Sequence, residues 1–242
     1  MEMTSIIIAN YNGGAWLKDC IYAIRQHTFS PYELIVVDNG SNDNTLDYCL
    51  QEDVILISLS ENEGFPKACN RGLRLARGNA ILLLNNDVLV AEGWLSGMLS
   101  CLYSHTDIGI VGPVTNYASG KQQIDIPYTN LREMAEHFSR LKQGNWQQVE
   151  RLVGFCYLFK RELLNQIGLL DERFSPGHYE DDDYCYRARQ AGYRLFMACD
   201  VFVYHHGSYS FNKENEEKVK ELIALNHQKF IDKWGVDPHI FI

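Results

Sequence analysis

Short apolar runs alternate with helix-type patterns along the first half of the chain. Four runs rich in β-branched and long apolar side chains predict strands that are covered on both faces, over residues 4–9, 33–37, 54–59 and 80–84. Between them apolar residues recur three and four positions apart, which predicts helices over residues 16–24, 45–50, 64–76 and 94–104. This order predicts an α/β fold with a Rossmann-like, mostly parallel central sheet and helices on both faces.

The second half of the chain has a less regular pattern. Strand-type runs cover residues 108–112, 151–159 and 194–204, and helical spacing covers residues 130–141, 161–167, 180–190 and 212–234. The polar face of the last helix contains Glu as freely as Lys, so we expect its apolar face to pack on the core rather than to bind a membrane.

Polar residues gather directly after three of the predicted parallel strands. These clusters span residues 10–14, 38–41 and 85–87. In open α/β sheets, ligands bind beyond the carboxyl ends of the strands, so the three clusters together predict one site at one edge of the sheet. Each cluster alone is also what ordinary surface turns contain.

Asp87 and two histidines are candidate metal ligands. Asp87 follows an apolar strand, and a carboxylate there can hold Mg²⁺ or Mn²⁺ and so bring phosphate oxygens to an acidic protein. His205 and His206 follow a later strand, and one of them could complete the site. The alternatives are an Asx turn at Asp87 and purely structural histidines, and spacing does not choose between the two imidazoles.

Four consecutive carboxylates, from Glu180 to Asp183, open a predicted helix, where the helix dipole favours negative charge. Asp183 and Arg187 are four residues apart and can form an ion pair on the helix face. Crowded carboxylates raise one another's pKa, which suits one of them to accept a proton near neutral pH. The alternative is a solvated first turn.

Composition and charge narrow the function classes. The 242 residues include 22 Lys and Arg against 31 Asp and Glu, a net charge of −9, and 46% are hydrophobic. These values exclude a disordered chain and disfavour nucleic-acid binding. No apolar run approaches the roughly 20 residues of a membrane span. The seven scattered cysteines predict reduced thiols in the cytoplasm. The GxGxxG, Walker and GxSxG motifs are absent, which disfavours dinucleotide-binding, P-loop and α/β-hydrolase proteins.

Five fragments resemble glycosyltransferase family two of the GT-A fold, particularly its bacterial rhamnosyltransferase-like members. They are SIIIANYNG (5–13), ELIVVDNGSNDNT (33–45), ENEGFPKACNRGL (61–73), LLLNNDVLV (82–90) and YEDDDYCYRARQAGY (179–193). The last fragment is the most informative. The resemblance implies a GT-A domain over residues 1–210, with a nucleotide-sugar-binding half (1–112) and an acceptor and catalytic half (113–210), followed by a helical extension over 211–242.

The resemblance also implies residue roles. Asp181 matches the family's catalytic base, and Glu180 beside it would contact the acceptor. Asp87 would bind Mg²⁺ or Mn²⁺ together with His205 or His206, while Asn85 stands where the first aspartate of the DxD motif often sits. The implied nucleotide-sugar-binding residues are Ala9, Asn10, Tyr11, Asp38, Asn39, Asn62, Lys67, Asn70, Asn85 and Asn86.

The implied activity is metal-assisted transfer of a hexose from a nucleoside-diphosphate sugar to an acceptor hydroxyl, in one inverting displacement. The acceptor would be a glycan, a lipid-linked glycan or a protein. Two alternatives stay open: a nucleotidyltransferase acting on sugar phosphates, although residues 10–14 lack the Lys or Arg that such enzymes use, and an inactive nucleotide-sugar-binding module. We expect a cytoplasmic protein, at most peripheral at the inner face of the membrane, and leave open whether it forms a homodimer.

Overall fold

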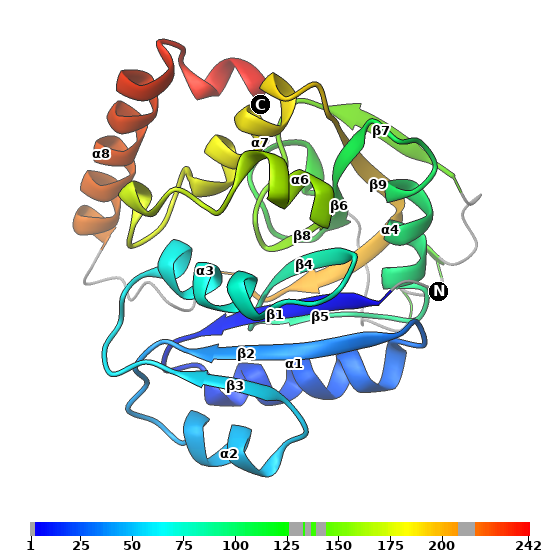
Figure 1. The fold of residues 1–242 in the computed structure, drawn as a ribbon, viewed down its shortest axis with the longest axis vertical. Coiled ribbons are helices and arrows are strands. Elements are labelled where there is room, and N and C mark those ends of the chain that lie inside the picture. Colours follow the sequence, from blue (N-terminus) through cyan, green and yellow to red (C-terminus); the bar gives the residue numbers. More distant parts are fainter. Residues whose placement is uncertain (1–2, 126–132, 134–136, 139–143, 208–215) are drawn as a thin grey trace.

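A nine-stranded sheet forms the centre of this computed structural model, which describes residues 3–125, 133, 137, 138, 144–207 and 216–242 (Figure 1). The strands follow the order β3-β2-β1-β4-β8-β6-β9-β5, and β7 pairs with β9 beside this path. They are β1 (Thr4–Asn10), β2 (Tyr32–Asp38), β3 (Ile55–Ser58), β4 (Ala80–Asn85), β5 (Val88–Leu89), β6 (Ile108–Thr115), β7 (Trp146–Val149), β8 (Cys156–Lys160) and β9 (Arg194–His205).

The first four strands are parallel, as their apolar runs predict. β1 pairs with β2 and β4, and β2 pairs with β3. In this register Asn10 lies opposite Asp38, and Ala9 lies opposite Asn85. The polar residues after these strands therefore reach the same edge of the sheet, which confirms the predicted α/β fold where it positions the candidate site.

Beyond β4 the sheet is mixed. β8 runs antiparallel to both β4 and β6, β9 is parallel to β6, and β5 and β7 are antiparallel to β9. The prediction of one strand over residues 151–159 is wrong in its first part, because residues 151–155 form a loop. Leu152 and Phe155 in this loop are buried, and their apolar side chains give the sequence the pattern that is typical of a strand. Its backbone N–H groups instead bond side chains: Val153 N donates to Gln122 and Gly154 N donates to Asp181.

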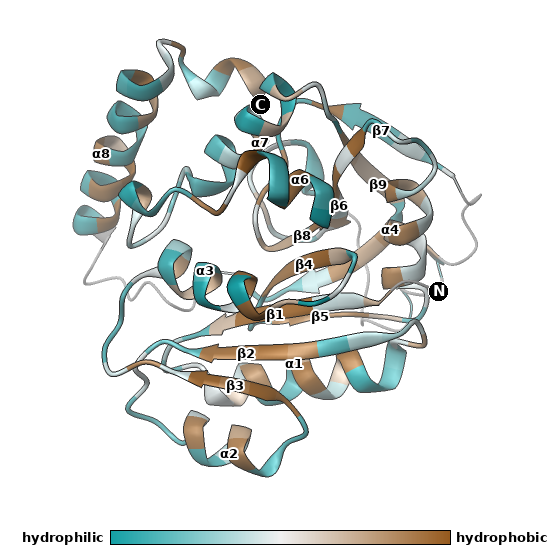
Figure 2. Cartoon of the chain, viewed as in Figure 1, coloured by the Kyte–Doolittle hydropathy of each residue, from teal (hydrophilic) through white to brown (hydrophobic). Residues whose placement is uncertain are grey.

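Helices cover both faces of the sheet. Alternate strand residues separate into two cores: Ile6 and Ile8 pack in one with α1 and α4, whereas Ile7 packs in the other with α3, α6 and α7. Figure 1 shows α1 and α3 on opposite sides of β1 and β2, and in Figure 2 β2 and β3 are hydrophobic along most of their length. The helices are α1 (Gly14–His27), α2 (Thr45–Gln51), α3 (Phe65–Leu75), α4 (Trp94–Leu102), α6 (Arg161–Ile167), α7 (Glu180–Gln190) and α8 (Glu216–Trp234), with short 3-10 turns η1 (Gly120–Gln122), η2 (Glu172–Phe174) and η4 (Pro238–Phe241).

Some predicted features cannot be compared with the structure. Most of the helix expected over 130–141, the start of the helix expected at residue 212 and the domain boundary near residue 210 lie outside the described residues. The seven cysteines are all described; six are buried and none is in a disulfide. Within the described ranges, no helix has both the length and the apolar character needed to cross a membrane.

The C-terminal helix α8 is fastened to the start of α7 by buried polar groups. The Asp183 side chain is fully buried and accepts hydrogen bonds from Arg187 Nε at 2.8 Å, Lys233 Nζ at 2.5 Å and Trp234 Nε1 at 2.8 Å. The predicted ion pair of Asp183 with Arg187 is thus confirmed, and α8 adds two donors to the same carboxylate. Asn226 Nδ2 donates to the carbonyl oxygens of residues 174, 177 and 178, just before α7.

Replacement of Asp183 by Asn should destabilise the protein by about 3 kcal/mol or more, because Arg187 and Lys233 would lose a buried countercharge. The measurement is the free energy of unfolding in urea. Asp232→Asn, an exposed position on α8, is the matched control and should change that free energy by no more than about 0.5 kcal/mol. Equal stabilities of the two variants would contradict the role of Asp183.

Candidate active site

The ends of β1 and β4 are joined by buried amide side chains. Asn10 is 1% exposed, and its Nδ2 donates to Thr45 Oγ1 at 3.0 Å. Its Oδ1 accepts from Asn86 Nδ2 at 2.5 Å. A Cβ atom on Gly13 would lie 2.2 Å from Asn86 Nδ2, so the turn after β1 needs glycine there to let Asn86 approach. The clusters predicted at residues 10–14 and 85–87 therefore meet.

The second strand contributes Asp38 and Asn39 to the same edge. Asp38 is 2% exposed and its Oδ1 accepts from Ser41 N at 3.3 Å. Asn39 Nδ2 donates to Asn62 Oδ1 at 2.8 Å, and Asn39 Oδ1 accepts from Glu63 N at 2.9 Å. The segment before α3 is thereby held against the end of β2.

The other predicted nucleotide-sugar-binding residues differ in their surroundings. Ala9 is partly buried beside Asn10, and Tyr11 is 45% exposed after it. Lys67 is partly buried on α3 and forms no hydrogen bond or ion pair with any described residue. Asn70 is 1% exposed and is fully used inside the protein: Nδ2 donates to Leu170 O and Glu172, and Oδ1 accepts from Leu170 N. Asn70 therefore joins α3 to the segment after α6, with no amide hydrogen left for a nucleotide sugar.

Asp87 and His205 meet although 118 positions separate them along the sequence. The short strand β5 pairs Val88 with His205, which sets Asp87 Oδ1 3.2 Å from His205 Nε2. His205 Nδ1 lies 2.8 Å from the carbonyl oxygen of Tyr117, which places the ring hydrogen on Nδ1. When the ring is neutral, the lone pair of Nε2 is then directed to Asp87, the arrangement in which an imidazole can bind a metal ion. Asn85 Nδ2 lies 3.4 Å from the same nitrogen.

His206 has different surroundings. Its ring lies on Trp16, with centroids 4.3 Å apart, and contacts Tyr204 edge-on. Burial lowers the pKa of His206, which favours its neutral form. A carboxylate oxygen and one imidazole nitrogen suit Mg²⁺ or Mn²⁺, so the residues present fit such an ion, and the geometry favours His205 over His206 as the second ligand.

The four carboxylates at the start of α7 point to different partners. Glu180, Asp182 and Asp183 are buried, and Asp181 is the one that is partly exposed. Both oxygens of Asp181 are oriented by backbone groups, because Oδ2 accepts from Gly154 N at 2.8 Å and Oδ1 from Asp182 N at 2.9 Å. The alternative of a solvated first turn is wrong, since three of the four side chains are inside the protein.

Asp182 and Glu180 are less accessible. Asp182 forms a two-point ion pair with Arg151. Burial lowers the pKa of the Arg151 guanidinium, but the charge of Asp182 raises it, and the pKa is raised overall. Glu180 is 7% exposed, which leaves little surface for the acceptor contact predicted for it. Its Oε2 is buried without a hydrogen-bond partner among the residues described.

One turn connects the carboxylates of α7 with the candidate metal ligands. Gly154 N bonds Asp181, and the next residue, Phe155, stacks its ring on His205 with centroids 5.2 Å apart and planes 17° apart. Phe155 O also accepts from Asn85 N at 2.8 Å. Two consecutive residues thus touch both halves of the site. Sequence patterns missed them, because the apolar spacing of 151–159 indicates a strand.

A family model described as glycosyl transferase family 2 matches residues 5–168. The chain belongs to this family. Glycosyltransferase family 2 is also the family that the five sequence fragments indicate, so the resemblance is confirmed.

Several curated relatives are named as glycosyltransferases. Glycosyltransferase GlyG from Streptococcus pneumoniae is 25% identical over 194 residues, covering 75% of this chain and 63% of GlyG. N-acetylglucosaminyl-diphospho-decaprenol L-rhamnosyltransferase from Mycobacterium tuberculosis is 23% identical over 243 residues, covering 88% of this chain and 79% of that protein. With 63% of GlyG covered, the chain spans less than two thirds of the length of that relative.

Solved structures agree on the fold. The mannosyltransferase PcManGT from Pyrobaculum calidifontis, in complex with GDP-Man and Mn²⁺, has a TM-score of 0.66 at 20% identity, covering 86% of this chain and 59% of that one. GalNAc-T7 with UDP, GalNAc and Mn²⁺ has a TM-score of 0.69 at 19% identity, covering 85% of this chain and 44% of the other. The predicted GT-A fold is confirmed.

The buried Glu180 should make this family 2 domain less stable as pH rises. Burial, and then the Asp181 charge, raise the pKa of Glu180 well above its usual value. The folded state then keeps a proton that the unfolded chain releases, so stability falls as pH increases from the usual pKa of Glu towards the raised one.

Glu180→Gln removes the titrating carboxyl group and should abolish its contribution to the loss of stability at higher pH. Unfolding free energies of wild type and variant, measured in urea at several pH values, should diverge by at most about 1.4 kcal/mol per pH unit, with the wild type declining relative to the variant. Parallel curves would show that Glu180 titrates normally in the folded protein.

Proposed function

We propose that this chain transfers a sugar from a nucleoside-diphosphate sugar to an acceptor hydroxyl, with Asp181 as the general base. The observation that supports this most is the turn of Gly154 and Phe155, which contacts Asp181 on one side and His205 and Asn85 on the other. A base for the acceptor and ligands for the donor diphosphate are the two parts that such a transfer needs in one site. The relatives named above are consistent with it.

The donor would lie along the edge formed by the ends of β1, β2 and β4. Asp38, Asn39 and Asn62 are the proposed contacts to the nucleoside, beside the exposed Tyr11 ring. Asp87 and His205 would hold Mg²⁺ or Mn²⁺. When bound, the ion would offset charge on the departing diphosphate. This explains how a protein with a net charge of −9 can bind a small polyanion.

Asp181 would remove the acceptor proton. Its two oxygens each accept a backbone hydrogen bond, so the carboxylate has a fixed direction, and its partial exposure leaves it accessible to a hydroxyl group. The acceptor oxygen forms a bond to the anomeric carbon as the bond from that carbon to the diphosphate oxygen breaks. One base and one displacement give inversion of the anomeric configuration. A hexose donor and a glycan, lipid-linked glycan or protein acceptor are part of this proposal.

Asp181→Asn should lower the transfer rate by about 10²–10⁴-fold while donor binding is kept, because the amide keeps the size of the side chain and can keep one of the two backbone contacts through its oxygen, but it cannot accept the proton. The measurement is release of nucleoside diphosphate, screened over uridine, thymidine and guanosine donors with an acceptor. Asp47→Asn, an exposed position on α2, is the control and should turn over at the wild-type rate. A variant with near wild-type turnover would remove Asp181 from the role of base, and wild type that releases no diphosphate with any donor would favour the binding-module alternative.

His205→Leu should abolish the part of nucleoside-diphosphate stabilisation that depends on Mn²⁺, whereas His206→Ala should keep it. The reason is that only His205 directs a ring nitrogen to Asp87. The measurement is the shift in Tm on adding the diphosphate with and without Mn²⁺. If both variants respond like the wild type, the ion does not use His205; urea unfolding without ligand verifies that both are folded.

A further inference from the structure

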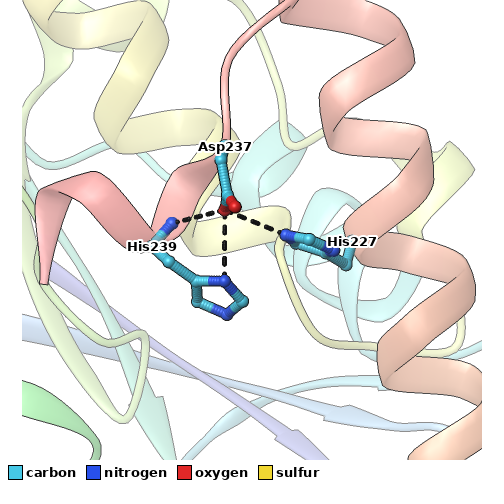
Figure 3. A group of neighbouring side chains, drawn as sticks. All are labelled: His227, Asp237 and His239. Carbon is cyan, nitrogen blue, oxygen red and sulfur yellow. Dashed lines mark hydrogen bonds and ion pairs between the residues drawn. The ribbon is translucent and has the colours of Figure 1, made fainter.

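A second cluster of metal-type ligands lies at the C-terminal end of the chain, on elements that the proposed reaction does not use. Asp237, just after α8, lies between His227 of α8 and His239 of η4 (Figure 3). Asp237 Oδ1 is 3.0 Å from His227 Nε2 and 3.1 Å from His239 Nδ1. Within the described ranges this is the one group of three His, Cys, Asp or Glu residues whose ligand atoms all lie within 4.8 Å of one another.

These separations match those of neighbouring ligands around one ion. Two ligand atoms that are each about 2.1 Å from a metal lie about 3 Å apart at right angles, as in octahedral coordination, and about 3.4 Å apart at the tetrahedral angle that Zn²⁺ prefers. The imidazole-to-carboxylate distances of 3.0 and 3.1 Å lie at the lower end of this range, so small side-chain movements would admit an ion of either geometry. Two imidazole nitrogens with one carboxylate oxygen form a donor set typical of Zn²⁺ and similar divalent transition ions, and less suited to Mg²⁺ or Ca²⁺.

A simple ion-pair explanation accounts less well for this geometry. Salt bridges from Asp237 to both histidines require both rings to be protonated. The rings of His227 and His239 are stacked, with centroids 4.6 Å apart and planes 29° apart, so two positive charges there would repel each other. Neutral imidazoles avoid this repulsion: without an ion each ring can donate one N–H to Asp237, and with an ion present the same nitrogens can bind the metal in the other tautomer.

The backbone brings the three groups together independently of an ion. Gly235, with φ of +69°, ends α8 and reverses the chain. Asp237 Oδ1 accepts from His239 N at 2.9 Å, which caps η4 and sets His239 beside its carboxylate. The side chains are between 25% and 57% exposed, so an ion can reach them and water can complete its coordination.

We propose that His227, Asp237 and His239 form a binding site for a divalent transition ion of the Zn²⁺ class, separate from Asp87 and His205. Such an ion would tie the end of α8 to η4. Phe241 of η4 lies 4.0 Å from the Arg189 guanidinium on α7, so the ion would also hold the C-terminal turn against the helix that contains Asp181.

The test is a Zn²⁺ titration of the chelator-treated full chain by calorimetry, in an Asp87→Asn background that disables the other site. One Zn²⁺ should bind, and the same addition should raise Tm. His239→Ala should weaken this binding at least about tenfold. Loss of a residue that supports a metal ligand already lowers metal affinity by about that factor, and loss of the ligand itself should cost no less. Asp237→Asn, which keeps an N-cap residue but loses the charged ligand, should weaken it as well.

His105→Ala is the matched control, because His105 is exposed and is placed outside the cluster. It should bind Zn²⁺ as tightly as the background protein. The proposal is overturned if the Asp87→Asn protein binds no Zn²⁺, or if His239→Ala and Asp237→Asn bind it unchanged. Neither result bears on sugar transfer, since the test measures Zn²⁺ binding and not turnover, and His239→Ala and Asp237→Asn do not touch Asp181 or His205.

Discussion

The backbone hydrogen bond from Gly154 to Asp181 is the interaction on which the arrangement of the site depends. This hydrogen bond orients Asp181, the proposed base. Phe155, the residue after Gly154, contacts His205, the proposed metal ligand. A Cβ atom on residue 154 would lie 3.3 Å from Asp181 Cβ, so the close approach favours glycine. The turn lies directly before β8, which runs antiparallel to both of its neighbours, β4 and β6. The antiparallel strand β8 therefore places this turn between the parallel half of the sheet and α7.

The acidic run of α7 is a set of four carboxylates with separate tasks. Asp183 binds α8, Asp182 binds Arg151, and Glu180 is enclosed by the protein. Asp181 remains with an accessible carboxylate. The three buried carboxylates hold the start of α7 in one position, so the side chain of Asp181 has a defined direction. A cluster that looks redundant in the sequence thus contains three acids enclosed by the protein and one that stays accessible.

The parallel half of the sheet was predictable because its signals are local. An apolar run followed by Asn or Asp identifies both a strand and the edge where it ends, as for residues 4–10 and 80–87. The choice between His205 and His206 was not predictable, because it depends on Tyr117 and on the two-residue strand β5. Asn70 lies within a family-like fragment, yet its amide bonds Leu170, a partner 100 positions away. Such long-range contacts leave no periodic pattern in the sequence.

The buried carboxylate that receives α8 has an evolutionary consequence. Lys233 bonds both Asp183 and Asp171, so its loss would remove a positive partner from two acids at once, whereas loss of either acid would leave the partly buried Lys233 with one carboxylate instead of two. Substitutions at these three positions should be tolerated only in combination. The terminal helix is therefore not a freely exchangeable module: a chimera that imports it from another family member would need to import the matching acids in α7 and in the segment before it as well.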